Sequence, residues 1–553
     1  MLNVLLLALL FVVLFSAIVP YNMDEFIHYD TILCHLYPGN NLQGTCDPFQ
    51  LNFLNTGLIL PLRAYYYSGS FPSVYFLPIV LLWSSPLAAR CLGMAFLLLG
   101  GYIAARTLKL RTVFVLLGLV TLFPYLFQHL VDTGPIGFQI LSVFLIFALL
   151  DRWCSTLNVR YISAITLLIF CGVWTKFAYF WYAPGLAILF LIHGIRHRRF
   201  LFARGQCSRF FLQSFLSLFI LLVLVGSLLL STAPDNPAAK PFLEPLLYSG
   251  SYSFLELWNG VWWHTTAVTL LLHPLEATQR VFEVIPADGP SLFYSIVVYL
   301  FAPVTLVLLF MVGGRGFPRK KLLLPASLFV AFVLTVVMIA RTKDAQGIHH
   351  AILSYPFLIL ASLATMRCLF DIACDPPRRW LRWLFYVWLA AYIAANGILF
   401  VTFPSQPYRF HDEPEKFLVH TIINTGTIPD RTMVLTVDWG MFYYSGLFGS
   451  AKKSVLFEWG LKDQNRILYL KDLAARNGRK LVILYTSKET AADIPLIESL
   501  VPMERCAATP ANAAWVMLAE PDAEITKVCD TFASIERTAS PAKQLLLRAS
   551  LTQ

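Results

Sequence analysis

The sequence predicts an α-helical polytopic membrane protein with a small C-terminal α/β domain outside the membrane. Its 553 residues are 58% hydrophobic and only 13% charged, and the mean hydropathy is +0.65. A soluble protein carries roughly twice that share of charged residues. Long apolar stretches recur up to residue 403, and the composition changes after that point. A soluble enzyme, a disordered chain and a disulfide-bonded peptide scaffold are therefore excluded.

Eleven apolar stretches are long enough to cross a bilayer, whose hydrocarbon core needs roughly 17–25 helical residues. We predict spans at 4–20, 86–107, 112–130, 136–151, 160–175, 179–195, 210–230, 291–313, 322–341, 350–367 and 383–403. The first lacks the basic residues and the cleavage site of a signal peptide, so we expect it to remain as an anchor. The apolar stretches 51–62 and 71–83 are predicted as interfacial helices within an external loop over 21–85, and a second long external loop covers 232–290.

Basic residues gather in alternate loops, and this bias sets the predicted orientation. The loops after the second, fourth, sixth, eighth and tenth spans carry eighteen Lys and Arg residues, against six in the opposite loops. Cytoplasmic loops carry such an excess in membrane proteins. We therefore predict a multi-pass protein of a bacterial inner or plasma membrane, with a cytoplasmic N-terminus and an external C-terminal domain. The net charge of +10 follows from this bias and does not indicate a nucleic-acid partner.

After residue 403 the pattern becomes that of a small α/β domain at 404–535, followed by a flexible tail at 536–553. Short β-rich runs alternate with an amphipathic helical stretch, in the order Met433–Asp438, 462–477, Leu481–Tyr485 and Ala514–Leu518. Strands that alternate with helices are typical of a compact α/β domain.

Carboxylates lie at the predicted external ends of two spans, where ionisable groups are costly and often functional. Asp24 and Glu25 follow the first span, and Asp132 lies in the short turn between the third and fourth spans. Such carboxylates can act as a general base for an acceptor hydroxyl. A polar helix exit and an ordinary turn carboxylate explain the same residues without any reaction, so both interpretations stay open.

Cations and histidines lie on the same predicted side. Arg63 is in the first external loop, and Arg341, Lys343, His349 and His350 precede or open the tenth span. They could bind a phosphate or simply anchor helices at the interface. Carboxylates and cations at one mouth fit a reaction between a lipid phosphate and a hydroxyl nucleophile. The chain has no phosphate loop, G-x-G-x-x-G, H-E-x-x-H or C-x-x-C motif, which argues against nucleotide-driven and zinc-protease chemistry.

Several short motifs support a more specific interpretation. They are the Asp24-Glu25 pair at the end of the first span, the stretch 72–110 with Pro72, Tyr75 and Arg90, and the DWGM sequence at 438–441. With these motifs the chain resembles the GT-C superfamily of integral-membrane glycosyltransferases, in particular the protein O-mannosyltransferases and the lipid A aminoarabinose transferases. The resemblance covers the first 180 residues well and the later spans in topology.

This resemblance implies that residues 1–403 form a GT-C-like glycosyltransferase domain. Its donor would be a sugar on a polyprenyl phosphate, transferred with inversion to a hydroxyl or amine of a lipid, glycan or protein acceptor. Asp24 would be the catalytic carboxylate, with Glu25 beside it and Asp132 as a second acidic residue. The contacts to the donor phosphate would come from Arg63, Arg341, Lys343, His349 and His350.

The sequence also departs from the superfamily. His28 stands where the mannosyltransferases have a tyrosine, and their inserted β-trefoil domain is missing, which puts a protein acceptor in doubt. A divalent metal is not required where protein cations neutralise the phosphate, and its presence is left open. A transporter or flippase of lipid-linked sugars is the alternative function. It predicts polar residues at the bilayer midplane, whereas the charges here lie at one interface.

Overall fold

The computed structural model describes residues 50–110, 136–230 and 432–519, each of these with gaps, together with 319–341, 352–372 and Trp383. The chain divides into two compact units. The helical unit comprises Met1–Val19, Tyr66–Pro72 and Pro86–Arg409. The mixed unit comprises Pro20–Tyr65, Ser73–Ser85 and Phe410–Gln553.

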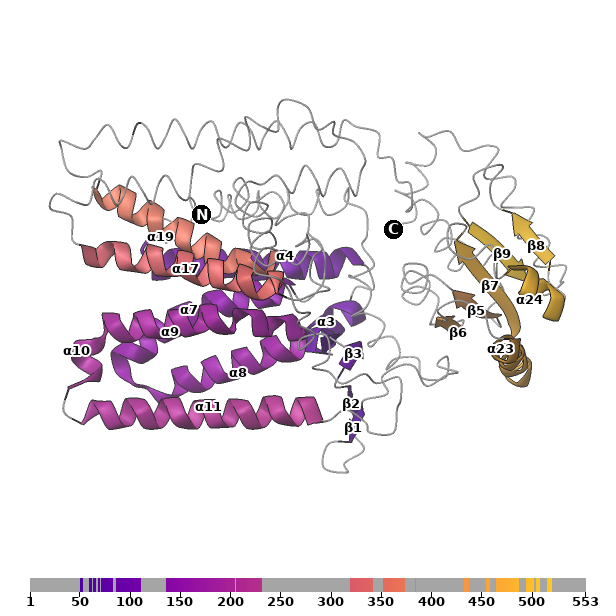
Figure 1. Ribbon diagram of the computed structural model, residues 1–553, viewed down its shortest axis with the longest axis horizontal. Coiled ribbons are helices and arrows are strands. Elements are labelled where there is room, and N and C mark those ends of the chain that lie inside the picture. Colours follow the sequence, from indigo (N-terminus) through magenta and orange to yellow (C-terminus); the bar gives the residue numbers. More distant parts are fainter. Residues whose placement is uncertain are drawn as a thin grey trace. The chain divides into compact units, whose positions relative to one another are not determined.

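Helices, most of them long, make up nearly all of the described part of the helical unit, and most of them lie side by side in Figure 1. They are α4 (Pro86–Thr107), α7 (Ile136–Thr156), α8 (Val159–Thr175), α9 (Ala183–Arg196), α10 (Arg198–Leu201), α11 (Gln206–Leu230), α17 (Arg319–Ala340) and α19 (Tyr355–Ile372), with short 3-10 helices η3 (Phe177–Tyr182) and η5 (Ile352–Ser354). Seven predicted spans coincide with these helices. The predicted spans 4–20, 112–130, 291–313 and 383–403 fall outside the described residues, Trp383 excepted.

Four helical stretches are long and apolar enough to cross a membrane, judged by length and composition: Gly137–Thr156, Phe177–Arg196, Gln206–Leu228 and Leu322–Ala340. The outward face of α11 carries large apolar side chains, among them Phe215 and Leu222, which are 66% and 62% exposed. Exposure of such a surface to water is unfavourable, whereas lipid tails solvate it. The chain is therefore an integral membrane protein.

Polar contacts hold α11 against its neighbours from the inside. Trp153 Nε1 of α7 donates a hydrogen bond to Gln213 Oε1 over 2.8 Å. Gln213 Nε2 donates to the backbone oxygen of Leu157 over 3.0 Å. Thr166 of α8 and Ser217 of α11 share a hydrogen bond between their hydroxyls. Hydrogen bonds between helices are a common means of association in membranes, where apolar contact alone does not favour protein over lipid.

Small residues set the close approach of α4 and α7. A Cβ added at Gly100 of α4 would lie 2.4 Å from the Phe144 ring of α7, and one added at Gly137 would lie 3.1 Å from the backbone oxygen of Gly93. Both contacting pairs advance along the two helices in the same direction. The helices α4 and α7 therefore run parallel, and their C-terminal ends lie at the same end of the bundle.

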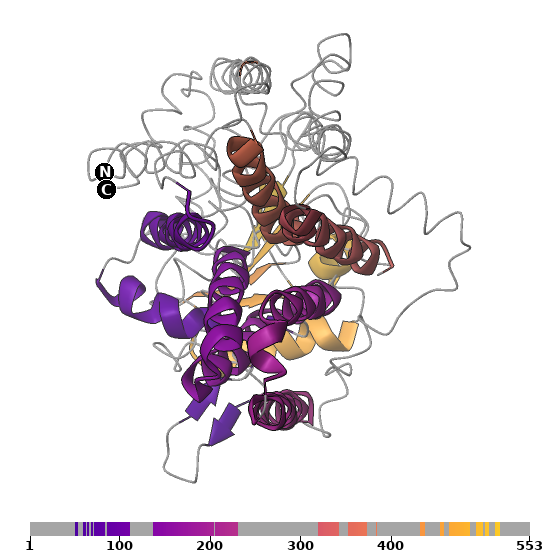
Figure 2. The ribbon, with the colours of Figure 1, turned by 90° about the vertical axis from the view of Figure 1, so that its left-hand side faces the viewer.

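That end of the helical unit also gathers the basic segments that the sequence places in alternate loops. Arg196, at the end of α9, contacts Asp151 in the last turns of α7. Arg367 Nη1 of α19 donates to the backbone oxygen of Lys109, just after α4, over 3.0 Å. We call this the basic end, and Figure 2 looks onto it. The opposite end, where α7 begins and η3 lies, is called the mouth end.

The mixed unit contains a five-stranded sheet in the order β6-β5-β7-β9-β8. Its strands are β5 (Thr432–Thr436), β6 (Ser454–Phe457), β7 (Lys480–Thr486), β8 (Glu504–Ala507) and β9 (Trp515–Ala519). The pairing of β5 with β6 and with β7 is parallel, and that of β9 with β7 and with β8 is antiparallel. The parallel pairs are the hallmark of strand–helix–strand connections.

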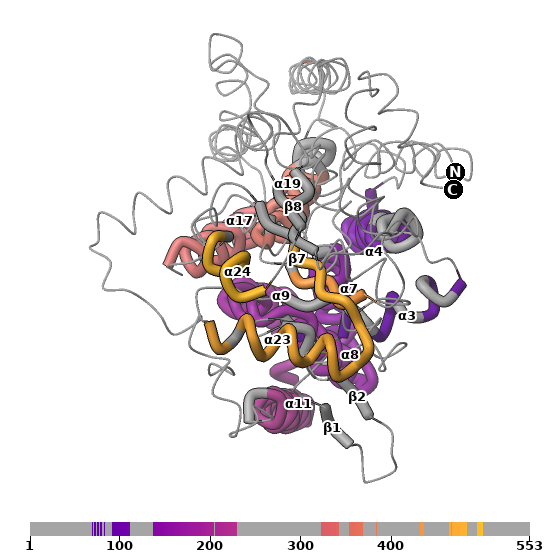
Figure 3. The backbone as a smooth tube through the Cα atoms, turned by 90° about the vertical axis from the view of Figure 1, so that its right-hand side faces the viewer, coloured from indigo at the N-terminus to yellow at the C-terminus, as the bar shows by residue number. Residues whose placement is uncertain are grey.

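Two helices, α23 (Gln464–Arg476) and α24 (Ile494–Leu500), pack beside the sheet and against each other, as Figure 3 shows. Leu470 and Ile497 of these helices share a buried core with Leu481 and Ile483 of β7. Strands β5, β7 and β9 and helix α23 lie where the sequence predicts them. The short elements β6, β8 and α24 were not predicted, because runs of four to seven residues carry little periodic signal.

One predicted interfacial helix is wrong. Instead of a helix over 51–62, the described residues form β1 (Gln50–Asn52) and β2 (Ile59–Pro61), which pair antiparallel. The sequence Asn55-Thr56-Gly57 between the two apolar runs is a turn signal that favours a hairpin over a continuous helix. The second predicted helix, at 71–83, is present as α3 (Phe71–Leu82), and its interfacial position stays a prediction.

The contacts of Gln213 predict its contribution to stability. A Gln213→Leu substitution removes two hydrogen bonds that tie α11 to α7 and to the α7–α8 turn. We expect a loss of about 1 kcal/mol, since a hydrogen bond between membrane helices contributes on average about 0.6 kcal/mol. Thermal unfolding of the purified protein in detergent measures this. Ser227→Ala is the matched control, because among the described residues the Ser227 hydroxyl donates to Val223 of its own helix. Equal midpoints in the two variants would contradict the prediction.

Candidate functional site

Most of the predicted site residues lie outside the described part of the chain. This holds for Asp24, Glu25, Asp132, Lys343, His349 and His350. Arg63 is the first residue of strand β3 (Arg63–Tyr65), of which the backbone is described. Arg341 follows α17 directly and its side chain is exposed. Among the predicted residues, the structure therefore describes the side chain of Arg341 alone, and whether the others converge stays a prediction.

The mouth end carries a buried polar cluster on α7 and η3. Gln139 and Ser142 lie one turn apart on α7, which begins four residues after Asp132. Ser142 Oγ donates to the backbone oxygen of Gln139 over 2.7 Å and lies 2.8 Å from the Tyr179 hydroxyl of η3. Since the single Ser142 proton goes to Gln139, the Tyr179 hydroxyl donates to Ser142. Gln139 Nε2 also donates to the backbone oxygen of Lys176.

Two side-chain oxygens of this region are buried without a hydrogen-bond partner among the described residues: Gln139 Oε1 and the Tyr182 hydroxyl. Buried polar atoms are nearly always paired with protein, water or a ligand. The Tyr182 ring packs edge-on against Tyr179 at 4.9 Å between centroids and against Phe357 of α19 at 5.7 Å. The mouth end thus combines packed aromatic rings with buried hydrogen-bonding groups that have no partner among the described residues.

Arg341 belongs to the same end of the bundle. Helix α17 starts at the basic end, where Leu323 and Leu324 line the same cavity as Arg199, and it therefore finishes at the mouth end. It contacts η3 and η5 there. An exposed cation at this position is free of any acidic partner in the described part of the chain. The role of Arg341 as a phosphate contact stays a prediction.

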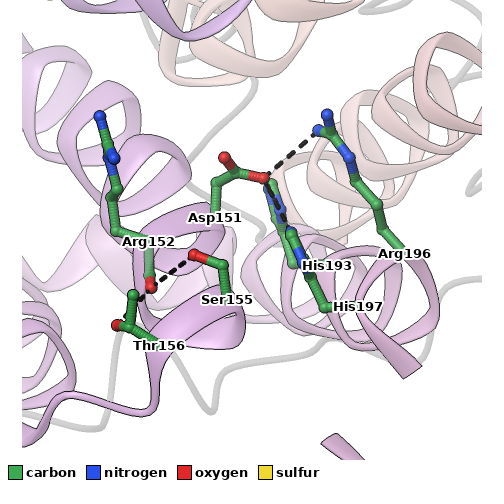
Figure 4. A network of polar contacts seen from close by, with 7 residues as sticks. All are labelled: Asp151, Arg152, Ser155, Thr156, His193, Arg196 and His197. Carbon is green, nitrogen blue, oxygen red and sulfur yellow. Dashed lines mark hydrogen bonds and ion pairs between the residues drawn. The ribbon is translucent and has the colours of Figure 1, made fainter. Parts of the chain in front are cut away.

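A second polar cluster lies at the basic end, and Figure 4 shows its residues. Asp151 Oδ1 of α7 lies 3.1 Å from His197 Nε2, 3.3 Å from Arg196 Nη1 and 3.5 Å from His193 Nδ1. The partners of Asp151 lie on one face of the chain around the end of α9. Arg196 and His197 follow His193 by three and four residues, which corresponds to about one helical turn. His193 is completely buried, whereas Asp151 and His197 are half-buried.

The Asp151 cluster has the donor set of a metal site. One donor atom from each of Asp151, His193 and His197 lies within 4.8 Å of the others, and imidazole and carboxylate are ligands that Zn²⁺ accepts. Arg196, however, already pairs with the same carboxylate oxygen, so a cation would have to displace a guanidinium. In this structure the cluster links α7 to α9 through electrostatic contacts of Asp151. The sequence signal was the His193-x-x-x-His197 spacing, which lacks an acidic partner nearby in the chain.

Basic side chains also line a cavity of about 850 Å³ at this end. It lies among the ends of α4, α9, α17 and α19 together with α10. Its cations are Lys109, Arg196, Arg198, Arg199 and Arg367. Sequence reasoning attributed these residues to membrane orientation, because a loop-by-loop count of charges does not show that separate loops converge on one cavity.

Comparison with known proteins identifies the fold. No family model matches the chain, and no curated protein does. The structure of ArnT from Cupriavidus metallidurans bound to undecaprenyl phosphate is similar with a TM-score of 0.52 at 12% identity, over 95% of this chain and 98% of that one. Its apo state has a TM-score of 0.43 at 13% identity, over 95% and 98%. The apo oligosaccharyltransferase of Archaeoglobus fulgidus has 0.38 at 12%, over 91% and 73%.

The similarity to the lipid-bound ArnT structure extends over nearly the whole length of both chains. At this level of identity it concerns the fold alone. The chain therefore has a fold similar to that of this ArnT structure, in agreement with the resemblance to the lipid A aminoarabinose transferases that the sequence predicts.

The packing of Gly172 predicts how the mouth end responds to a small change. A Cβ at Gly172 would lie 2.4 Å from the Tyr179 ring, so Gly172→Ala must displace this ring and with it the bond to Ser142. Overpacking of this kind costs about 1–3 kcal/mol, and we expect a lower thermal midpoint. Gly194→Ala on α9 is the control, since no atom of the part of the chain that the structure describes lies within 4 Å of its added Cβ. A midpoint equal to wild type in Gly172→Ala would show that the ring adapts without cost.

Proposed function

We propose that the chain is an integral-membrane glycosyltransferase that transfers a sugar from a polyprenyl-phosphate donor to an acceptor hydroxyl or amine on the extracytoplasmic face. The observation that carries the proposal is the agreement of two independent comparisons. The motifs at the end of the first span and at 72–110 resemble the GT-C superfamily. The fold separately matches ArnT, a protein solved with undecaprenyl phosphate.

The reaction requires a base for the acceptor and positive charge for the leaving phosphate. We assign the base to Asp24, with Glu25 beside it, and a supporting acidic role to Asp132. The proposed cations are Arg63, Arg341 and Lys343, with His349 and His350 as further phosphate contacts. The acceptor oxygen attacks the anomeric carbon as its proton passes to the carboxylate. The bond from that carbon to the phosphate oxygen breaks, and the configuration is inverted.

The membrane itself contributes to this chemistry. A polyprenyl chain holds the donor at the bilayer surface, so the donor reaches the site already oriented, and little translational freedom remains to be lost. The buried Gln139 and Tyr182 groups at the mouth end offer hydrogen-bonding partners to a polar ligand. Protein cations can stabilise the departing phosphate, so the proposed reaction does not depend on a divalent metal.

Asp24→Asn tests the assignment of the base. The substitution is nearly isosteric but cannot accept a proton, and general base catalysis contributes roughly 100–10,000-fold. We expect transfer from a polyprenyl-phosphate sugar to fall by that factor while donor binding persists. Asp30→Asn, which removes an equal charge a few residues later, should remain active. Full activity in Asp24→Asn at saturating donor would exclude Asp24 as the base, and donor translocation without transfer in the wild type would favour a flippase.

The exposed position of Arg341 predicts a graded response to substitution. A guanidinium can bind a phosphate through two parallel hydrogen bonds, whereas an ammonium is a single mobile charge. We therefore expect Arg341→Ala to weaken donor binding more than Arg341→Lys, and Lys343→Ala to have a smaller effect than Arg341→Ala. Initial rates over a range of donor concentrations measure this. If the donor dependence of every variant equals that of the wild type, these cations only anchor helices at the interface.

A further inference from the structure

We propose that the cavity at the basic end binds the phosphate headgroup of an anionic membrane lipid. This site is distinct from the proposed donor site, because its residues lie at the opposite end of the bundle from α7's first turns and Arg341. It does not depend on the proposed glycosyltransferase function. The proposal rests on the convergence of cations, the uncompensated charge and the mixed lining of the cavity.

The cations come from segments that are distant in sequence. Lys109 follows α4, the group from Arg196 to Arg199 joins α9 to α10, and Arg367 lies on α19. Arg367 is held in place by its hydrogen bond to the backbone oxygen of Lys109, over 3.0 Å. Lys109 has a φ of 55°, an uncommon conformation for a non-glycine residue, and it turns the chain at the end of α4. The fold therefore brings Arg367 and Lys109, which are 258 residues apart in the sequence, to the same cavity.

The charge of the cavity is not balanced by its own lining. No carboxylate is among the described residues that line it, and Asp151 pairs with Arg196 from outside that lining. The C-terminal ends of α4 and α9 contribute about half a negative charge each. Arg196 is already paired with Asp151, and Arg367 is engaged at the backbone oxygen of Lys109. Of the remaining lining cations Lys109, Arg198 and Arg199, the two helix ends offset roughly one. An anion of one or two charges is the ligand that this arrangement favours.

The apolar part of the lining distinguishes a lipid from a free anion. Ile195, Phe200 and Leu323 line the same cavity as the cations and are 41%, 37% and 41% exposed. A ligand with a phosphate and adjoining acyl chains satisfies both parts of this surface, whereas inorganic phosphate satisfies only one. The volume of about 850 Å³ is within the range of pockets that hold small molecules. Basic pockets between membrane helices are known binding sites for lipid headgroups.

Membrane orientation alone would also enrich basic residues at this end, so a matched control is needed. Arg152 and Arg160 lie near the same end, on α7 and α8, and both are exposed. Neither lines the cavity. A variant without the charges of Arg152 and Arg160 loses two positive charges from this end, as does a variant without the charges of Arg198 and Arg199.

Lipid binding to the full-length protein, delipidated in detergent, tests the proposal by native mass spectrometry. The probes are dioleoyl phosphatidylglycerol, dioleoyl phosphatidylcholine and inorganic phosphate. We expect one tightly bound phosphatidylglycerol, and about 30-fold weaker binding in the Arg198→Gln/Arg199→Gln variant, from about 1 kcal/mol for each cation near a phosphate. The Arg152→Gln/Arg160→Gln control should change by less than about threefold, since exposed charges farther away are screened.

Arg367→Lys adds a variant that keeps the charge of the cavity. It should bind phosphatidylglycerol several-fold more weakly, because the ammonium loses the planar fork of donors. Equal losses in the cavity variant and its control would overturn the proposal in favour of general surface charge. Phosphatidylcholine bound as tightly as phosphatidylglycerol, or inorganic phosphate bound as tightly as the lipid, would overturn it as well. Unfolding midpoints of all variants confirm that the bundle is intact.

Discussion

Hydrogen bonds between helices inside an apolar solvent are the constraint on which the rest of this structure depends. Lipid tails solvate the outward Phe215 and Leu222 of α11 as well as a protein core would, so the hydrophobic effect gives this helix little preference for protein over lipid. Trp153, Gln213 and the hydroxyls of Thr166 and Ser217 supply the specific contacts. The close contact of Gly100 with Phe144 then brings α4 against α7. The membrane thus permits large apolar side chains on the outside of the bundle, while the described interior is also mostly apolar and contains a few polar contacts between helices.

The same constraint directs chemistry to the two ends of the bundle. A charge in the hydrocarbon core is costly, so Arg341 and the basic cavity lie where helices end. Parallel packing of α4 and α7 makes the two ends chemically different, because it collects Lys109, Asp151 and Arg196 at one of them. The mouth end has neutral hydrogen-bonding groups such as Gln139 and Tyr182. The two ends of the bundle therefore present different groups to a phosphate-bearing lipid: cations at the basic end, and neutral hydrogen-bonding groups at the mouth end.

Sequence patterns predicted what depends on local periodicity. The apolar runs of α7, α8, α9, α11, α17 and α19 and the β-rich runs of β5, β7 and β9 were found because each carries its own signal. The hairpin of β1 and β2 was mistaken for a helix, since an apolar run of this length fits both structures. The Asp151 cluster and the basic cavity were missed for another reason. Their residues come from separate helices, and only tertiary packing brings them together.

Arg196 links the two polar features of the basic end. Its guanidinium lies 3.3 Å from Asp151 Oδ1, and its side chain also lines the cavity. A divalent cation at Asp151, His193 and His197 would be repelled by this charge at short range, whereas an anion in the cavity would be attracted by it. The charge of Arg196 therefore disfavours a metal ion at the histidine cluster and favours an anion in the cavity. With Arg196 held between carboxylate and cavity, the electrostatics of this end favour an anion.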